Sequence, residues 1–306
     1  MTDKAYKAHS TPLLTIKMVP IDISVIVTTR NEEKNITECL NSIRKQSYPR
    51  DKIEIIVVDN NSQDKTKESA FKYTDKVFNF GPERSAQRNF GVRQAKGKYI
   101  LYLDSDMVLS PDVIKECVDK CESGNYIALY IPERIVGEGF WIKVRDFERG
   151  FYNATCIDAV RFVRKGKFQE IGGFDEALTG PEDWDFDRRI SSAGETAVIN
   201  SCLYHNEDNF DLKKYMEKKL YYTRDFERYA RKWGKQDRII KRQMGMGYRY
   251  FGVFMEKGKS RRLFSRPLLA LAMYFLRLSV GLAYVFNPGA GVGSQPVRLC
   301  LKKPGY

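Results

Sequence analysis

The chain has 306 residues, of which 42% are hydrophobic and 30% are charged, and its formal net charge is +13. This length and apolar content suit one large α/β domain of about 200 residues plus an appendage, and they exclude a chain that is disordered throughout. The six cysteines form no CxxC pair, which argues against a zinc ribbon or a disulfide scaffold.

The positive charge is concentrated towards the C-terminus. Residues 1–210 hold 30 Lys and Arg against 33 Asp and Glu, whereas residues 211–266 hold 18 against 6 and residues 267–306 add a net charge of +4. Residues 1–20 lack the apolar core of a secretory signal, so we expect an N-terminal tail and no export from a reducing cytosol.

Strands and helices alternate in the first part of the sequence. The pattern predicts three strands, each followed by a helix, and the strands fall at residues 21–30, 52–59 and 98–106. Such alternation is typical of a mainly parallel sheet with helices on both faces. Beyond residue 124 the pattern predicts strand-like pieces around a helix at 140–154, another short strand at 195–205, and helices from residue 211 onward.

The segment at residues 267–286 is hydrophobic except for Arg277 and Ser279. Its length matches a transmembrane helix, but an arginine near the middle costs about 2.5 to 3.5 kcal/mol on insertion scales. A spanning helix and a helix lying in the membrane interface therefore both stay open. Residues 257–266 precede the segment and supply cations where anionic head groups would lie.

Two carboxylates, Asp104 and Asp106, follow the third predicted strand and flank Ser105. Together they can hold a hard divalent cation that bridges to a diphosphate. A solvated acidic turn is the alternative. Ligands bind beyond the carboxyl ends of parallel strands, so the position favours a metal site.

Five segments occur in order within residues 21–205: IDISVIVTTRNEEKNI, IEIIVVDNNSQDKT, ERSAQRNFGVRQAKGKYILYLDSDM, GGFDE and PEDWDF. This series resembles the motifs of family 2 glycosyltransferases, which have the Rossmann-like GT-A fold. The resemblance implies an inverting hexosyltransferase that uses a UDP- or GDP-linked sugar and Mn²⁺ or Mg²⁺. It places a catalytic domain at 21–210 and a basic helical region at 211–306, with a membrane-associating segment at 267–286.

The resemblance also assigns a donor site. Its predicted substrate-binding residues are Thr28, Arg30 and Glu32 near the nucleoside, Asp59 on the base, Arg84, Arg88 and Asn89 near the ribose or phosphates, and Asp104 with Ser105. An ordinary solvated helix face is the alternative for the arginines. TTRNEE stands where many relatives carry a proline and a tyrosine before the asparagine, so the contact made by Arg30 stays open.

Asp183 matches the position at which inverting relatives keep their general base, a carboxylate that takes the proton of the acceptor hydroxyl. An acidic helix start is the competing interpretation. Glu182 and the turn at Gly173 are predicted to face the acceptor, and Trp184 either stacks on a sugar or packs in the core. In many relatives a histidine at the position of His205 completes the metal shell with the paired aspartates, although a lone histidine is often structural.

We therefore expect transfer to a hydroxyl of a lipid-linked glycan or polysaccharide at the cytoplasmic face of the cell membrane. A polyprenyl phosphate is already ionised and would need no base, so the presence of Glu182 and Asp183 favours a hydroxyl acceptor. A polyprenyl-phosphate glycosyl synthase is the alternative. A nucleic-acid-binding module would use the basic C-terminal region but leave the acidic motifs unexplained, so no nucleic-acid partner is expected. A nucleotidyltransferase would need a glycine-rich loop that VTTRNEE lacks.

Overall fold

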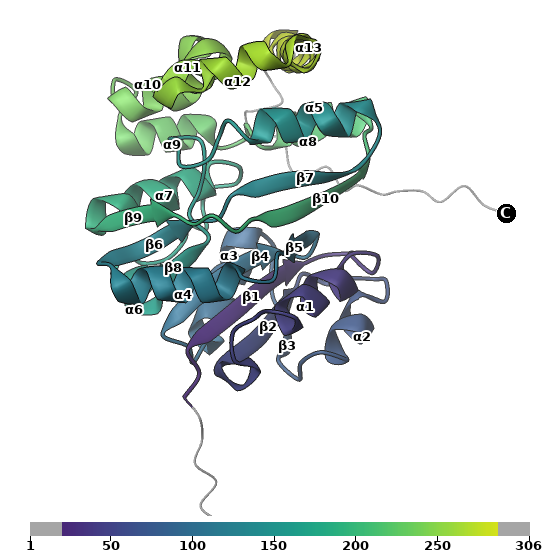
Figure 1. Ribbon diagram of the computed structural model, residues 1–306, viewed down its shortest axis with the longest axis vertical. Coiled ribbons are helices and arrows are strands. Elements are labelled where there is room, and N and C mark those ends of the chain that lie inside the picture. The colour runs from purple at the N-terminus through teal and green to yellow at the C-terminus, as the bar shows by residue number, and fades with distance from the viewer. Residues whose placement is uncertain (1–19, 287–306) are drawn as a thin grey trace, which may run out of the picture.

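The structure is a computed structural model that describes residues 20–286 (Figure 1), so almost all of the predicted tail at residues 1–20 lies outside the described residues. The strands are β1 Ile23–Thr29, β2 Ile53–Asp59, β3 Val77–Asn79, β4 Tyr99–Asp104, β5 Met107–Leu109, β6 Tyr126–Tyr130, β7 Glu133–Glu138, β8 Phe162–Arg164, β9 Glu195–Val198 and β10 Leu203–Asn209. The main helices are α1 Ile36–Arg44, α2 Thr66–Phe71, α3 Arg84–Gln94, α4 Val113–Ser123, α5 Phe140–Arg149, α6 Lys165–Glu170, α7 Glu182–Ala193, α8 Leu212–Tyr221, α9 Phe226–Trp233, α10 Arg238–Met244, α11 Val253–Met255, α12 Ser260–Ser265 and α13 Pro267–Phe286.

The central sheet has seven strands in the order β3-β2-β1-β4-β8-β6-β9. The first four strands in this order run parallel to one another, and only β8 is antiparallel to its neighbours. Every residue of β1 and β2 is buried, as expected for apolar, β-branched strands covered on both faces. The predicted mainly parallel sheet is confirmed.

Helices cover both faces of this sheet (Figure 1). On one face, Leu40 of α1 and Val113 at the start of α4 belong to a core built on β1, β2 and β4. On the other, Val92 of α3, Phe168 of α6 and Phe186 of α7 form a second core. This arrangement leaves the carboxyl ends of β1 and β4 side by side at one edge, where the parallel register pairs Thr28 of β1 with Asp104 of β4.

A second, three-stranded sheet lies beside that edge in the order β5-β10-β7. The prediction of one short strand at 195–205 is wrong, because the segment forms β9 in the central sheet and β10 in the small sheet. The chain turns between them where the carboxylate of Glu116 accepts hydrogen bonds from the backbone N–H groups of Asn200 and Ser201, at 2.6 and 2.8 Å. β10 pairs antiparallel with β5, and this register sets His205 opposite Met107, next to Asp106.

The helices from α8 to α13 follow the two sheets: α8 lies beside α5, and α10 to α13 lie beyond it at one end of the molecule (Figure 1). The helix predicted for residues 267–286 is confirmed with the same bounds. It contributes Met273 and Leu276 to a core shared with Phe147 and Phe151. Within residues 20–286, no helix combines the length and the apolarity that a membrane crossing requires.

Candidate functional site

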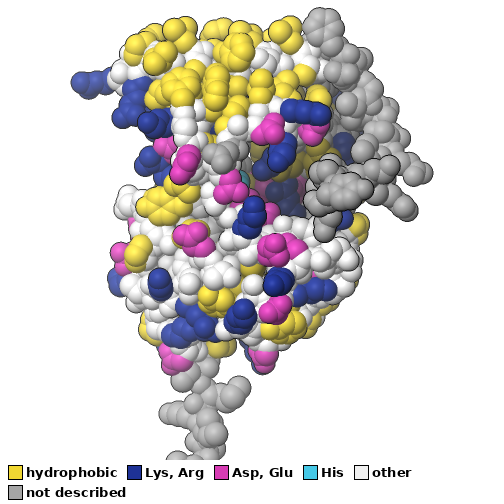
Figure 2. Space-filling view, turned by 90° about the vertical axis from the view of Figure 1, so that its right-hand side faces the viewer, with side chains coloured by type: hydrophobic (Ala, Val, Ile, Leu, Met, Phe, Trp, Pro, Cys, Tyr) yellow, Lys and Arg dark blue, Asp and Glu magenta, His cyan; other side chains and the backbone are white. Residues whose placement is uncertain are grey.

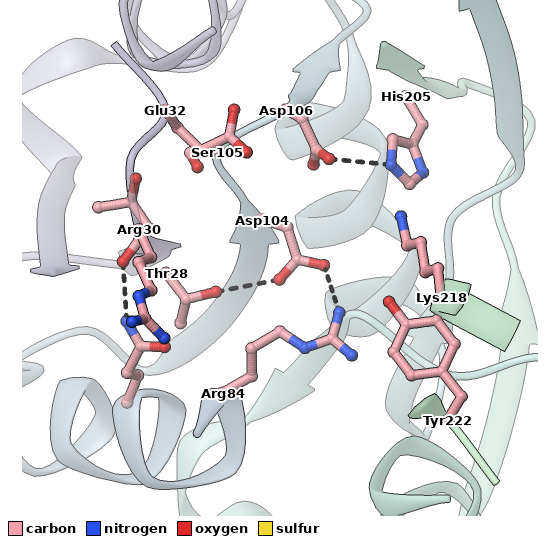
Figure 3. Close-up of a pocket in the computed structure, with 12 residues that line it drawn as sticks. Thr28, Arg30, Glu32, Arg84, Asp104, Ser105, Asp106, His205, Lys218 and Tyr222 are labelled. Atoms are coloured by element: carbon pink, nitrogen blue, oxygen red, sulfur yellow. Dashed lines mark hydrogen bonds and ion pairs between the residues drawn. The ribbon is translucent and has the colours of Figure 1, made fainter. Parts of the chain in front are cut away.

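A pocket opens where β1 and β4 end, between the central sheet and the C-terminal helices (Figure 3). Four parts of the chain line it: the end of β1, the first turns of α3, the β4–β5 turn with β10, and α8. The lining residues are Thr28, Thr29, Arg30, Glu32, Arg84, Gln87, Asp104, Ser105, Asp106, His205, Lys218 and Tyr222. Eight of the residues predicted from the sequence therefore converge on one cavity.

Asp104 is held by three neighbours on the sheet side of the pocket. Its Oδ1 atom accepts from Thr28 Oγ1 at 3.0 Å and from Arg88 Nη2 at 3.2 Å, and its Oδ2 atom lies 3.4 Å from Arg84 Nη1. Burial opposes ionisation, but the guanidinium groups of Arg88 and Arg84 hold the pKa of Asp104 well below its usual range. Asp104 is therefore a fixed anion.

Asp106 and His205 lie next to each other in the pocket, and Figure 3 shows the contact between them. His205 Nε2 lies 3.1 Å from Asp106 Oδ2, and its Nδ1 lies 3.0 Å from Oε1 of the buried Glu133. The other carboxylate oxygen of Asp106 is buried and has no hydrogen-bond partner. Burial lowers the pKa of His205, but Asp106 and Glu133 outweigh it and raise that pKa to about 10. A divalent cation would displace the proton that His205 Nε2 shares with Asp106. The neutral imidazole, oriented by Glu133, and the unpartnered oxygen of Asp106 would then form a donor set that fits such a cation.

The predicted three-residue metal shell is only partly assembled. The described residues contain no group of three or more His, Cys, Asp or Glu side chains that could hold a metal ion. Asp104 is directed at Arg84 and Arg88, so Asp106 and His205 are the two predicted side chains that could hold a metal ion. Mg²⁺ is often bound by one or two side chains plus substrate phosphates, whereas an imidazole ligand favours Mn²⁺.

Arg88 lies under the pocket and not in its wall. It is fully buried, contacts the ring faces of Tyr102 and Phe174 at 4.9 and 5.0 Å, and joins Asp104 to Asp183, whose Oδ1 lies 2.7 Å from Arg88 Nη1. The alternative of a solvated helix face is therefore wrong for this arginine. Arg88 acts on the site through two carboxylates.

Glu182 and Asp183 begin α7 beside this arginine. Glu182 is buried, and its Oε1 lies 3.2 Å from Arg84 Nη2 while its Oε2 has no partner. Burial and the neighbouring Asp183 raise the pKa of Glu182. The side chain of Asp183 is 27% exposed, so of the two it is the carboxylate that a group from solution can reach. Asp185, in the same turn, is fully buried and bound to Arg189 and Lys232.

Asp59 does not line the pocket. Its carboxylate is fully buried and accepts hydrogen bonds from the backbone N–H of Ser62 at 2.8 Å and from the Ser62 hydroxyl. The Ser62 hydroxyl accepts from the backbone N–H of Asn31, so the two loops that follow β1 and β2 are tied together. The predicted contact with the nucleotide base stays a prediction.

Three other predicted residues, Asn89, Gly173 and Trp184, do not line the pocket. The amide of Asn89 accepts from the backbone N–H of Phe174 and donates to its carbonyl, both at 2.9 Å, which fixes the turn that follows Gly173. Gly173 has a φ of +69°, and a Cβ there would lie 2.6 Å from the Asn89 amide oxygen. Trp184 packs in a cluster with Tyr229 of α9, which supports the packing alternative over sugar stacking.

Sequence reasoning missed five residues of the site. Two of them, Thr29 and Gln87, line the pocket beside predicted residues. Lys218 and Tyr222, from α8 and its C-terminal end, line the side of the pocket opposite β1 (Figure 3), and Glu133 orients His205 from β7. The excess of lysine and arginine in residues 211–266 was the available signal for Lys218, but nothing in the spacing distinguished it from its neighbours. Glu133 carries no local signal, because β7 and β10 meet only in the fold.

Residues 24–174 match the family described as Glycosyl transferase family 2. Over 102 residues the chain is 38% identical to the poly(ribitol-phosphate) beta-N-acetylglucosaminyltransferase TarS of Staphylococcus aureus, which covers 30% of this chain and 18% of that protein. The chain spans less than a third of the length of the first curated relatives it matches.

Two solved structures share the α/β fold. The S. aureus TarS 1–349 complex with UDP-GlcNAc has a TM-score of 0.55 at 21% identity, covering 87% of this chain and 92% of that one. The mannosyltransferase PcManGT of Pyrobaculum calidifontis, in complex with GDP-Man and Mn²⁺, has a TM-score of 0.55 at 20% identity, covering 89% and 84%. The predicted GT-A fold is thereby confirmed.

Proposed function

Through residues 24–174 the chain belongs to glycosyltransferase family 2, and from this membership we propose that it moves a sugar from a nucleoside-diphosphate sugar to an acceptor hydroxyl. The observation that carries the proposal is the convergence of Asp104, Asp106 and His205 on one pocket, with Asp183 joined to Asp104 through the buried Arg88. The comparison structures hold UDP-GlcNAc in one case and GDP-Man with Mn²⁺ in the other, which supports a nucleotide sugar as donor.

In the proposed reaction the donor diphosphate lies between the β4–β5 turn and α8. Asp106 and His205 would hold a divalent cation, which stabilises the negative charge that develops on the leaving diphosphate. Lys218 and Tyr222 line the other side of the pocket, and the ammonium group supplies a further positive charge near the phosphates. Asp104 is fixed by two arginines and orients the donor next to the cation.

The transfer step inverts the anomeric carbon. The acceptor oxygen forms a bond to this carbon as its bond to the diphosphate breaks, and the diphosphate leaves with the bonding electron pair. The carboxylate of Asp183 takes the acceptor proton, a role that contributes about 10²- to 10⁴-fold in rate. Glu182 is buried against Arg84 and shapes the acceptor side without being the base.

A base beside the pocket favours a hydroxyl acceptor over a polyprenyl phosphate, which is already ionised. We therefore propose a lipid-linked glycan or a polysaccharide as the acceptor and the cytoplasmic face of the cell membrane as the place of reaction. The nucleic-acid alternative gains no support, because it gives no role to the acidic residues Asp104 and Asp106 that the fold gathers at the pocket.

The test is a thermal-shift series with UDP, GDP and their sugars, each with and without Mn²⁺. A ligand at 100 times its dissociation constant raises the unfolding free energy by about 2.7 kcal/mol. We expect one nucleotide to give a metal-dependent shift, and Asp183→Asn to keep that shift while losing at least 100-fold in transfer rate. Asp119→Asn, on the exposed face of α4, is the matched control. A chain that binds no sugar nucleotide under any condition would refute the proposal.

A further inference from the structure

The C-terminal helices present an apolar face. Ten large hydrophobic side chains among the described residues are more than half exposed, and all except Phe71 fall within residues 246–282. We call the nine the apolar face: Met246, Phe251, Met255, Phe264, Leu268, Leu271, Phe275, Leu278 and Leu282. Figure 2 shows hydrophobic side chains gathered across this end of the molecule. Contiguous exposed apolar patches of this kind mark interaction sites.

The five members on α13 share one side of the helix. Leu268, Leu271, Phe275, Leu278 and Leu282 follow one another at intervals of three and four residues, which places them in a row along the helix. The opposite side carries Met273 and Leu276, both fully buried in the core shared with α5. One side of α13 therefore packs against the rest of the protein, and the other side faces outward.

Arg277 lies on the side of α13 that packs against the protein. It is 8% exposed, and its Nη1 atom lies 2.5 Å from Glu148 Oε1 and 2.6 Å from the Tyr152 hydroxyl. A helix that spans a bilayer needs apolar side chains on every side that contacts lipid. In α13 the side that carries Arg277 instead forms an ion pair with α5. The arginine that interrupts the hydrophobic segment thus anchors α13 along the protein surface.

The residues before α13 supply charge at the edge of the apolar face. Residues 257–266 contain five Lys or Arg and no acid. Arg261 and Arg266 are exposed, and neither has a carboxylate partner among residues 20–286. Two copies joined through this face would bring these cations together, whereas anionic head groups would neutralise them, at about 1 kcal/mol per cation near the surface.

We propose that the apolar face docks on an anionic phospholipid bilayer, with α13 lying in the plane of the interface and Arg261 and Arg266 among the head groups. A helix with one apolar side and cations at its edge binds membranes in this manner. Docking would hold the pocket beside a lipid-linked acceptor, and only this consequence rests on the proposed function.

The test is co-sedimentation of the full chain with unilamellar vesicles, in the absence of any sugar nucleotide. We expect binding to vesicles that contain phosphatidylglycerol, and much weaker binding to vesicles of phosphatidylcholine alone. The double variant Leu271→Glu, Phe275→Glu should bind at least tenfold more weakly. Phe71→Glu is the matched control, because Phe71 is 58% exposed but lies on α2, outside the apolar face.

Replacing the edge cations tests the electrostatic part. The double variant Arg261→Gln, Arg266→Gln should lose about tenfold or more in affinity for the anionic vesicles. Failure of the wild-type chain to bind, or equal binding by the Leu271→Glu, Phe275→Glu variant, would overturn the proposal. A wild-type chain that ignores vesicles but dimerises through this face would show that a second copy is the partner. Transfer to a water-soluble acceptor, measured in parallel, separates failure of docking from failure of the proposed function.

Discussion

Arg88 Nη1 lies 2.7 Å from Asp183 Oδ1, and this ion pair joins α3 to the first turn of α7. The same guanidinium holds Asp104 through its other terminal nitrogen at 3.2 Å. Because Arg88 is fully buried, it serves no ligand directly. It holds the carboxylates of Asp183, the proposed base, and Asp104 at a fixed separation, so the proposed geometry of transfer depends on a residue that a ligand in the pocket does not touch.

Replacing Arg88 with alanine should destabilise the protein, because Asp104 and Asp183 would face each other without their shared counter-charge. Removing one partner of a buried ion pair typically costs about 3 to 5 kcal/mol. Chemical denaturation measures the free energy of unfolding. Arg93→Ala, an exposed position on the same helix, should change it by no more than about 0.5 kcal/mol. A loss below about 1 kcal/mol for Arg88→Ala would show that the pair is not a structural link.

Asp187 should make stability depend on pH. Burial is the main cause that raises the pKa of this carboxyl to about 7, with a further contribution from Asp158. The folded state therefore favours the protonated form, so stability is highest below the unfolded pKa of about 4 and falls as the pH rises to about 7. Asp187→Asn should be more stable than the wild type by up to about 4 kcal/mol at pH 8 and close to it at pH 4. Thermal unfolding at both pH values measures this, and an equal effect at pH 4 and pH 8 would contradict it.

The parallel sheet and the paired aspartates could be predicted because both are local patterns: apolar β-branched runs, and acids directly after one of them. The rest of the site depends on contacts between distant segments. His205 reaches Asp106 only because β10 pairs with β5, and β5 is a three-residue strand without a distinct pattern. Arg84 and Arg88 are one helical turn apart and look alike in sequence, yet one lines the pocket and the other is buried beneath it.

Glu133 should control metal affinity by orienting His205. Its Oε1 lies 3.0 Å from His205 Nδ1, and loss of such a partner typically costs about 10- to 100-fold in metal affinity. Glu133→Gln should therefore raise, by that factor, the Mn²⁺ concentration needed for half of the nucleotide-dependent thermal shift. Glu133 also pairs with Arg149 and Arg161. Glu207→Gln is the control, since Glu207 pairs with Arg145 and its hydrogen bonds go to that arginine and not to His205. Equal metal requirements in the two variants would refute the orienting role.

Lys218 should bind the donor diphosphate from α8. It lines the pocket on the side facing Asp106 and His205, where a cation can meet phosphate oxygens that the metal does not reach. Lys218→Ala should weaken binding of the nucleoside diphosphate by about tenfold, which is the equivalent of one charge-assisted hydrogen bond of roughly 1.4 kcal/mol. The variant should bind the free nucleoside with unchanged affinity. Lys214→Ala removes a lysine one turn earlier on α8, outside the pocket lining, and should leave both affinities unchanged. Isothermal titration with the nucleoside and its diphosphate distinguishes the cases, because an equal loss for both ligands would mean that Lys218 supports the fold of α8 and does not recognise phosphate.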